Sequence, residues 1–226
     1  MGEVLVHLIE GLHWSYDADG PTQKPVGAYQ TKVDPFPCYH HDLALVEGLA
    51  ATLRAKAPVP RDVNVNVLTH EDLHRTNGWA THYSDYSKEK EDDGAYGWTG
   101  CIVLSGRRTE IHPAITRYVT VHEYGHVVEY ALAELRHGKK EMDSNPIRDE
   151  YADLRGLRKD VPYGGRTHHL MPCEVMANDF LHVMGVEREY WPHEVGPIFR
   201  GREILLPEVR QWWRAALRDL KKASRG

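Results

Sequence analysis

The sequence predicts a single α+β domain, in which short strands come early in the chain and helices make up most of the remainder. Three observations support this fold class. Valines alternate with asparagines over residues 63–67, as in a half-buried strand. A long helical pattern follows between Pro113 and Gly138. No internal repeat or low-complexity linker divides the 226 residues, and a chain of this length can bury one sizeable core.

The other expected strands also lie in the first half of the chain. Val4–Ile9 is a short apolar run that suits a strand, and residues 98–105 form a second such run. Residues 11–40 are rich in glycine, proline and aromatic residues, which favours irregular structure. We therefore expect residues 1–40 to form an N-terminal arm that is irregular beyond its first strand.

The helices are predicted from the spacing of apolar residues and from the residues that start or stop them. Asp42 can cap a helix that runs to about Lys56, and Pro58 follows its end. Further helices are expected over residues 113–137, 145–159, 172–185 and 207–222. The last of these makes residues 186–226 a C-terminal helical segment of the same domain.

The composition is that of an ordinary globular protein. Apolar residues make up 41% of the chain, charged residues make up 27%, and the formal net charge is −5. This charge argues against a nucleic-acid partner or a membrane surface, and a solvated helix end explains the locally basic residues 214–225. No run approaches the ~18 apolar residues that span a bilayer, and no basic segment opens the chain as in a secretory signal. The three cysteines form no CxxC pair, so we expect a cytoplasmic protein.

The run His122-Glu123-Tyr124-Gly125-His126 carries the clearest chemical signal in the chain. Two histidines four residues apart project from one face of a helix, which suits two ligands of a zinc ion with Zn–N distances of ~2.0–2.1 Å. Glu123 would then lie beside the metal as a general base. Gly125 inside a helix costs about 1 kcal/mol relative to alanine, a cost that close packing against a neighbouring element would explain.

Two histidines alone leave a catalytic zinc site incomplete, because such sites take three protein ligands and leave one position for water. No third histidine follows His126 at the spacing of a three-histidine site, so a carboxylate from a later helix is expected. Glu150, with Asp153, lies in a charged helix whose acidic residues suit a solvated face. Glu174 opens an otherwise apolar helix, where an unpaired carboxylate would be expensive to bury. Although it could simply cap that helix, we favour Glu174.

At this point the chain resembles the gluzincin branch of HExxH zinc peptidases that contains anthrax lethal factor and the Pro-Pro endopeptidases. The matching segments are HEYGHVVEYAL at 122–132, YGGRT at 163–167 and EVMANDF at 174–180. The resemblance implies a zincin-like metallopeptidase domain, with a small mixed sheet and an HExxH helix followed by a glutamate-bearing helix. It implies Glu174 as the third zinc ligand and Tyr163 as the residue that stabilises the transition state.

The chain departs from the family pattern at two places. The gap between the tyrosine and the glutamate is longer here, and it contains His168 and His169, either of which is an alternative to Tyr163 as the donor. Asn178-Asp179 stands where the family often has Glu-Ala. The metal-site core is expected to span residues 98–185.

The predicted function is that of a zinc metallopeptidase of the endopeptidase type, which binds one zinc ion and hydrolyses a peptide or protein substrate. His122, His126 and Glu174 would bind the metal, and Glu123 would take a proton from the attacking water. Two other interpretations remain open. One is a metal-binding protein without turnover, and the other is a zinc hydrolase that acts on a non-peptide amide. The oligomeric state is not predicted.

Four further features have both a functional and a structural interpretation. Residues 100–105 precede the metal helix and could pair with an extended substrate. Residues 80–97 could form a rim or lid over the site, although their charged part is also typical of a surface loop. His40-His41 could mark a second metal site, but such a cluster is more often structural. Cys173 could approach the zinc as an inhibitory thiolate, although simple packing explains it better.

Overall fold

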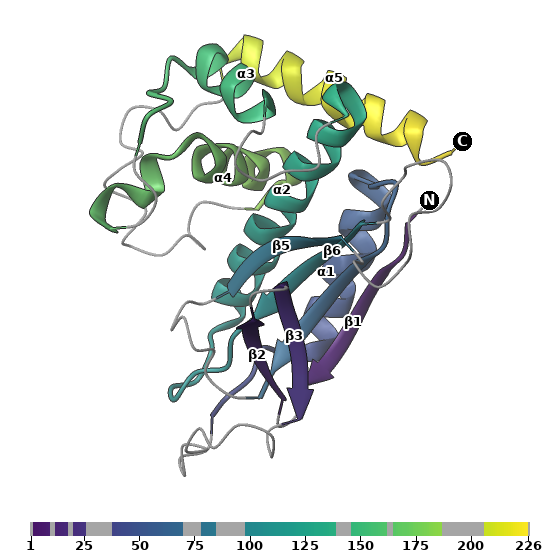
Figure 1. Ribbon diagram of the computed structural model, residues 1–226, viewed down its shortest axis with the longest axis vertical. Helices are drawn as coiled ribbons and strands as arrows, with labels where there is room; N and C mark the ends of the chain where they lie inside the picture. The colour runs from purple at the N-terminus through teal and green to yellow at the C-terminus, as the bar shows by residue number, and fades with distance from the viewer. Residues whose placement is uncertain are drawn as a thin grey trace.

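The computed structural model has the predicted α+β architecture (Figure 1). It describes residues 2–9, 12–17, 20–25, 38–69, 78–84, 98–138, 146–161, 165–186 and 206–225. The strands are β1 (Val4–Ile9), β2 (Leu12–Asp17), β3 (Gly20–Pro25), β4 (Val63–Leu68), β5 (Gly78–Ser84) and β6 (Trp98–Leu104). The helices are α1 (Leu43–Lys56), α2 (Pro113–His137), α3 (Pro146–Arg155), the 3-10 helix η2 (Gly165–Leu170), α4 (Pro172–Met184) and α5 (Pro207–Ala223).

Four strands form a mixed sheet in the order β1-β4-β6-β5. β1, β4 and β6 are parallel, whereas β5 runs antiparallel to β6. In the middle of the sheet, Val65 of β4 pairs with Val6 of β1 and with Ile102 of β6. Val65 and Ile102 are buried in the core, where α1 and α2 pack against the sheet and against each other (Figure 1).

The long helix α2 runs through the centre of the molecule, and its ends are the predicted ones. The His112 side chain caps its start by accepting a hydrogen bond from the Ala114 N–H at 3.2 Å. Gly138, at a φ of 63°, ends it in the left-handed region that favours glycine. Every residue from 118 to 133 is buried. A helix buried on all faces needs partners on all sides, which the sheet, α1 and α4 supply.

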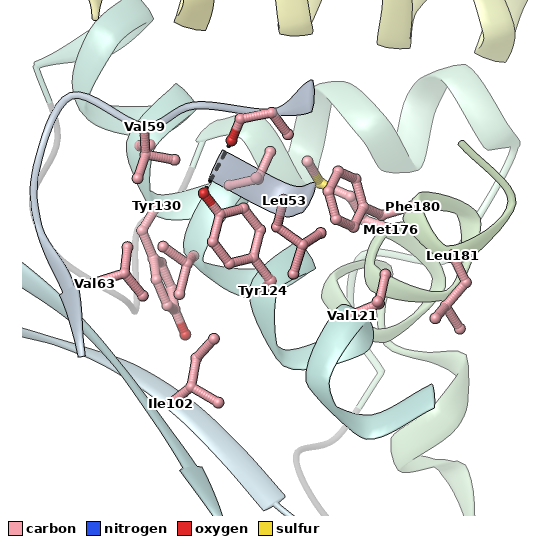
Figure 2. Packing of buried hydrophobic residues seen from close by; sticks show 14 of the residues in the cluster. Leu53, Val59, Val63, Ile102, Val121, Tyr124, Tyr130, Met176, Phe180 and Leu181 are labelled. Carbon is pink, nitrogen blue, oxygen red and sulfur yellow. Dashed lines mark hydrogen bonds between the residues drawn. The ribbon is translucent and has the colours of Figure 1, made fainter. Parts of the chain in front are cut away.

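The later helices α3, α4 and α5 pack on α2 and extend its core. Phe180 of α4 meets Trp213 of α5 with ring centroids 5.4 Å apart, and Trp213 Nε1 donates to the Tyr151 hydroxyl at 3.1 Å. Figure 2 shows Tyr124 of α2 beside Leu53 of α1, on the side of its ring where Phe180 of α4 lies. One continuous core therefore connects the sheet to the C-terminal helices.

The structure differs from the expected irregular arm over residues 11–40. β2 and β3 form an antiparallel pair within this segment, with Asp17 paired to Gly20 across a two-residue connection. The prolines of β3 mislead a sequence-based prediction, because a two-stranded ribbon has only edge strands, where proline is tolerated. Residues 85–97 of the expected rim lie outside the described residues. None of the described helices has the length and apolar character needed to cross a bilayer.

Candidate metal centre

Three side chains from two helices converge at the middle of α2. His122 and His126 come from α2 and Glu174 comes from the first turn of α4, and their candidate ligand atoms all lie within 4.8 Å of one another. Glu174 Oε2 is 3.2 Å from His122 Nε2, and Glu174 Oε1 is 3.5 Å from His126 Nε2. Both histidines are buried and the Glu174 side chain is only 14% exposed. This group could bind a metal ion.

The close approach of α2 and α4 brings Glu174 to the histidines, and Gly125 makes that approach possible. A Cβ placed on Gly125 would lie 2.9 Å from the Ala177 Cα and 3.3 Å from the Ala177 Cβ, closer than two such carbons normally come. Ala177 follows Glu174 by one helical turn. The glycine inside the predicted helix therefore allows the contact between helices that assembles the group.

The alternative carboxylate, Glu150, lies elsewhere. It accepts hydrogen bonds from Trp212 Nε1 and from Arg136 Nη1, the latter at 3.2 Å near the C-terminal end of α2. Its neighbour Asp153 pairs with Lys159 at 2.8 Å on the surface. Among the described residues, neither carboxylate belongs to the candidate metal group.

The electrostatic interactions within the group keep the Glu174 carboxylate ionised. Burial by itself raises the pKa of Glu174, but His126 and hydrogen bonds from His122 and His168 outweigh it and hold the pKa well below its ordinary value. Burial lowers the pKa of His126, whereas Glu174 and then Glu129 raise it to about 9. Without a metal, His126 therefore carries a proton that faces Glu174, and a divalent cation would take the place of that proton.

His122 is oriented by two residues, Tyr118 and Asn178, neither of which was predicted to support a ligand. Its Nδ1 donates to the Asn178 Oδ1 at 3.2 Å, since an amide oxygen can only accept. The Tyr118 hydroxyl donates to the same oxygen at 3.1 Å, and its ring stacks on the imidazole at a centroid distance of 5.5 Å. Burial, followed by Glu174, raises the pKa of Tyr118 and keeps its hydroxyl protonated. The Nε2 of His122 is thereby left to face Glu174.

His126 has a charged partner instead. Its Nδ1 lies 3.7 Å from the Glu129 Oε2, and the fully buried Glu129 accepts a hydrogen bond from Arg148 of α3. Carboxylates behind metal-binding histidines fix the orientation of the ring and raise its basicity. The helical spacing gave a signal for both supporting residues, because Glu129 follows His126 by three positions and Asn178 follows Glu174 by four.

Glu123 is the acidic residue of the motif that the candidate metal group does not use. It is 7% exposed and lies on the same turn of α2 as His122. Burial raises its pKa, and the electrostatic interaction with His122 and His126 opposes that rise. A carboxylate with a raised pKa beside a metal site is suited to accept a proton and then release it.

The predicted transition-state residue, Tyr163, lies outside the described residues. Of the two alternative histidines, the structure brings His168 to the group, with its Nε2 3.2 Å from the Glu174 Oε1. The hydrogen bond to Glu174 raises the pKa of His168 against the opposing effect of burial. The His168 side chain is 41% exposed, so it lies at the border between the buried group and solvent.

Two residues that were considered for other chemistry are structural. His41 is buried and its Nδ1 hydrogen-bonds the Thr116 hydroxyl at 2.9 Å, at the start of α2. No second candidate metal group includes it among the described residues. Cys173 is also buried, and burial, followed by Glu129 and Glu174, raises the pKa of its thiol. A protonated, packed cysteine does not act as an inhibitory thiolate.

The expectation that residues 100–105 pair with a substrate is wrong. β6 is paired with β4 on one side and with β5 on the other, so both of its backbone edges are used. The edge strand on this side of the sheet is β5. It lies directly against α2, since a Cβ on Gly78 would come within 2.6 Å of the Val119 Cγ1.

The donor set defines what the group can do chemically. Two imidazole nitrogens and one carboxylate oxygen are a set that catalytic zinc sites use, and a fourth position then remains for water. The residues present therefore fit a catalytic zinc ion. Searches of protein-family models, curated proteins and solved structures found no match to this chain.

Proposed function

We propose that this protein is a zinc-dependent metallopeptidase with a gluzincin-type site. His122, His126 and Glu174 would hold one zinc ion, and Glu123 would be the general base. The observation that carries the proposal is the meeting of Glu174 with the two α2 histidines, beside a buried glutamate that the group itself leaves unused. A metal site that serves structure alone has no need of such a base.

The mechanism follows from the position of each side chain. A bound zinc would lower the pKa of its water toward ~7 and polarise the substrate carbonyl. Glu123 would take the proton at its carboxylate as the water attacks and then deliver it to the leaving amine. His168, held by Glu174 at the border of the site, would donate to the developing oxyanion. By the resemblance to the gluzincin pattern, Tyr163 would donate to the same oxyanion.

The substrate of such a site would be an extended peptide that runs along the edge of the sheet. In the described part of the chain, β5 pairs only with β6 and lies against α2. A peptide added along the other edge of β5 would gain main-chain hydrogen bonds and pass beside α2, which carries the two histidines. Recognition through the main chain requires no terminus, and we therefore propose an endopeptidase.

The first experiment measures the metal content of the purified protein and its cleavage of a quenched-fluorescence peptide library. We expect about one zinc per chain, activity that a chelator abolishes, and recovery on addition of zinc. Glu123→Gln should keep zinc and lose activity by about 10²–10⁴-fold. Glu134→Gln is the matched control, because Glu134 lies on α2 but pairs with Arg61 at 3.6 Å, away from the site.

Each alternative function gives a different result in the same experiment. A metal-binding protein without turnover would hold zinc but cleave no peptide in the library. A hydrolase for non-peptide amides would cleave small acylated amines in a Glu123-dependent way and leave the peptides intact. Full activity in Glu123→Gln would disprove the proposed general base.

A further inference from the structure

A cavity of about 470 Å³ lies where the C-terminal ends of α1 and α5 meet. This volume is within the range of roughly 300–1,000 Å³ that is typical of small-molecule sites. Figure 1 shows the end of α5 near the upper end of α1. The residues that line the cavity come from positions 51–58 and 221–225, and none of them belongs to the candidate metal group.

All the charged residues that line this cavity are cations, namely Arg54, Lys221 and Arg225. The acidic partner of Arg54 is Glu3, whose Oε1 lies 3.7 Å from the Arg54 Nη2 and whose side chain is 60% exposed. A long, solvated pair of this kind neutralises little of the local charge. Within the described residues, no carboxylate forms an ion pair with Lys221 or Arg225. A local excess of positive charge thus faces the cavity, although the chain as a whole is acidic.

The helix dipole accounts for only part of this arrangement. Cations are favourable at a helix C-terminus, which explains Lys221 in the last turn of α5 and Arg225 just beyond the C-cap Ser224. It does not explain the Arg54 Nε and the Ser224 Oγ, which are buried without a hydrogen-bond partner. Ser224 is 4% exposed, and its backbone N–H already bonds the Leu220 carbonyl, so its hydroxyl is the unsatisfied group. Buried donors of this kind require an acceptor.

We propose that this cavity binds a phosphate group. A phosphate has enough oxygens to accept from both guanidinium groups, from the Lys221 ammonium and from the Ser224 hydroxyl at once. A guanidinium in particular matches two phosphate oxygens with its planar fork of N–H groups. A dianion would also offset two of the three positive charges that line the cavity. The site is independent of the proposed peptidase function.

The remaining wall of the cavity favours a phosphate ester over the free ion. Ala51, Ala55 and Pro58 line it with apolar surface. The organic part of a small phosphorylated molecule can contact this surface, whereas inorganic phosphate cannot use it. Two probes therefore separate the two sources of a phosphate group, phenyl phosphate for an ester and inorganic phosphate for the free ion.

Isothermal titration calorimetry of the full chain at low salt tests the site. We expect phenyl phosphate to bind, and to bind more tightly than inorganic phosphate. Lys221→Gln should weaken the binding about tenfold, because it removes one charge-assisted contact. Lys222→Gln is the matched control, since it removes the same charge from the same turn of α5 at an exposed residue that does not line the cavity. Ser224→Ala should also weaken binding, without altering the charge.

Three results would overturn the proposal. One is the absence of binding by either probe at millimolar concentration. Another is an equal loss of affinity in Lys222→Gln and Lys221→Gln, which would show general attraction to a basic helix end. A third is binding that a chelator abolishes and Lys221→Gln leaves intact, which would place the phosphate on the metal. Circular dichroism of Lys221→Gln is the control that this variant is folded. Failure of peptidase activity has no bearing on any of these outcomes.

Discussion

Replacing Gly125 with alanine tests how the candidate metal centre is assembled. Judged by helix propensity alone, Gly125→Ala should stabilise the interior of α2 by about 1 kcal/mol. The structure predicts the opposite sign, because the added Cβ would lie 2.9 Å from the Ala177 Cα. The obstructing atom belongs to the backbone of α4 and cannot rotate aside, and overpacking of this kind costs about 1–3 kcal/mol. Offset by the gain in helix propensity, this cost leaves an expected net loss of up to about 2 kcal/mol in the free energy of unfolding.

The same substitution should also weaken metal binding. Relief of the clash requires α2 and α4 to move apart, and Glu174 moves with α4. The Glu174 carboxylate oxygens now lie 3.2 Å from the His122 Nε2 and 3.5 Å from the His126 Nε2. A small displacement of α4 would therefore disturb the ligand set. We expect zinc affinity to fall about ten- to a hundredfold. Mutation of a residue that hydrogen-bonds a metal ligand causes a loss of similar size.

The assays are urea unfolding of the metal-free protein and zinc titration against a competing chromophoric chelator. Gly48→Ala is the control, because Gly48 is an exposed residue of α1 and an added Cβ would meet nothing within 4 Å. It should gain about 0.5–1 kcal/mol and bind zinc normally. If Gly125→Ala were stabilised to the same extent as Gly48→Ala, with unchanged zinc affinity, the close approach of the two helices would not be what assembles the site.

Three further predictions concern the ligands and their partners. Asn178→Leu removes the acceptor that orients His122 and should weaken zinc binding about 10–100-fold in the chelator competition, and an unchanged affinity would argue against that role. Zinc binding should strengthen about tenfold per pH unit as the pH rises from 6.5 to 8.5, because the pKa of His126 in the metal-free protein is about 9 and the metal must displace that proton. A flat affinity over this range would contradict the proton displacement. Glu150→Gln should leave zinc content and peptidase activity intact, since Glu150 bonds Arg136 and Trp212 instead, whereas zinc loss would make Glu150 a ligand after all.

Much of the secondary structure could be predicted because the signals are local. His112 and Gly138 cap α2 at the predicted ends, and Asp42 caps α1 by accepting from the Leu45 N–H. Each cap involves residues a few positions apart, so its hydrogen bonds depend little on the rest of the fold. The β2–β3 pair was missed because strand pairing in a proline-containing segment depends on contacts more than on the propensity of single residues.

Strand pairing within the four-stranded sheet could not be predicted either, because it depends on contacts between distant parts of the chain. The apolar run that forms β6 was predicted as a strand, but which strands pair with it was not predicted. Its position between β4 and β5 depends on segments that approach one another from different parts of the chain. The sequence therefore supported the strand, whereas its proposed role in substrate pairing required an unpaired edge that β6 does not have.

For the candidate site, too, local spacing predicts one part and tertiary contacts determine the rest. The spacing of His122, Glu123 and His126 was sufficient to predict that both imidazoles share a helix face, because helical geometry fixes that relation within one turn. The apolar sequence around Glu174 favoured it over Glu150 as their partner, but no local rule places either carboxylate within reach of the histidines. The tertiary structure makes the choice where Gly125 lets α4 approach α2 at Ala177, since only that contact brings a distant carboxylate within reach of both histidines.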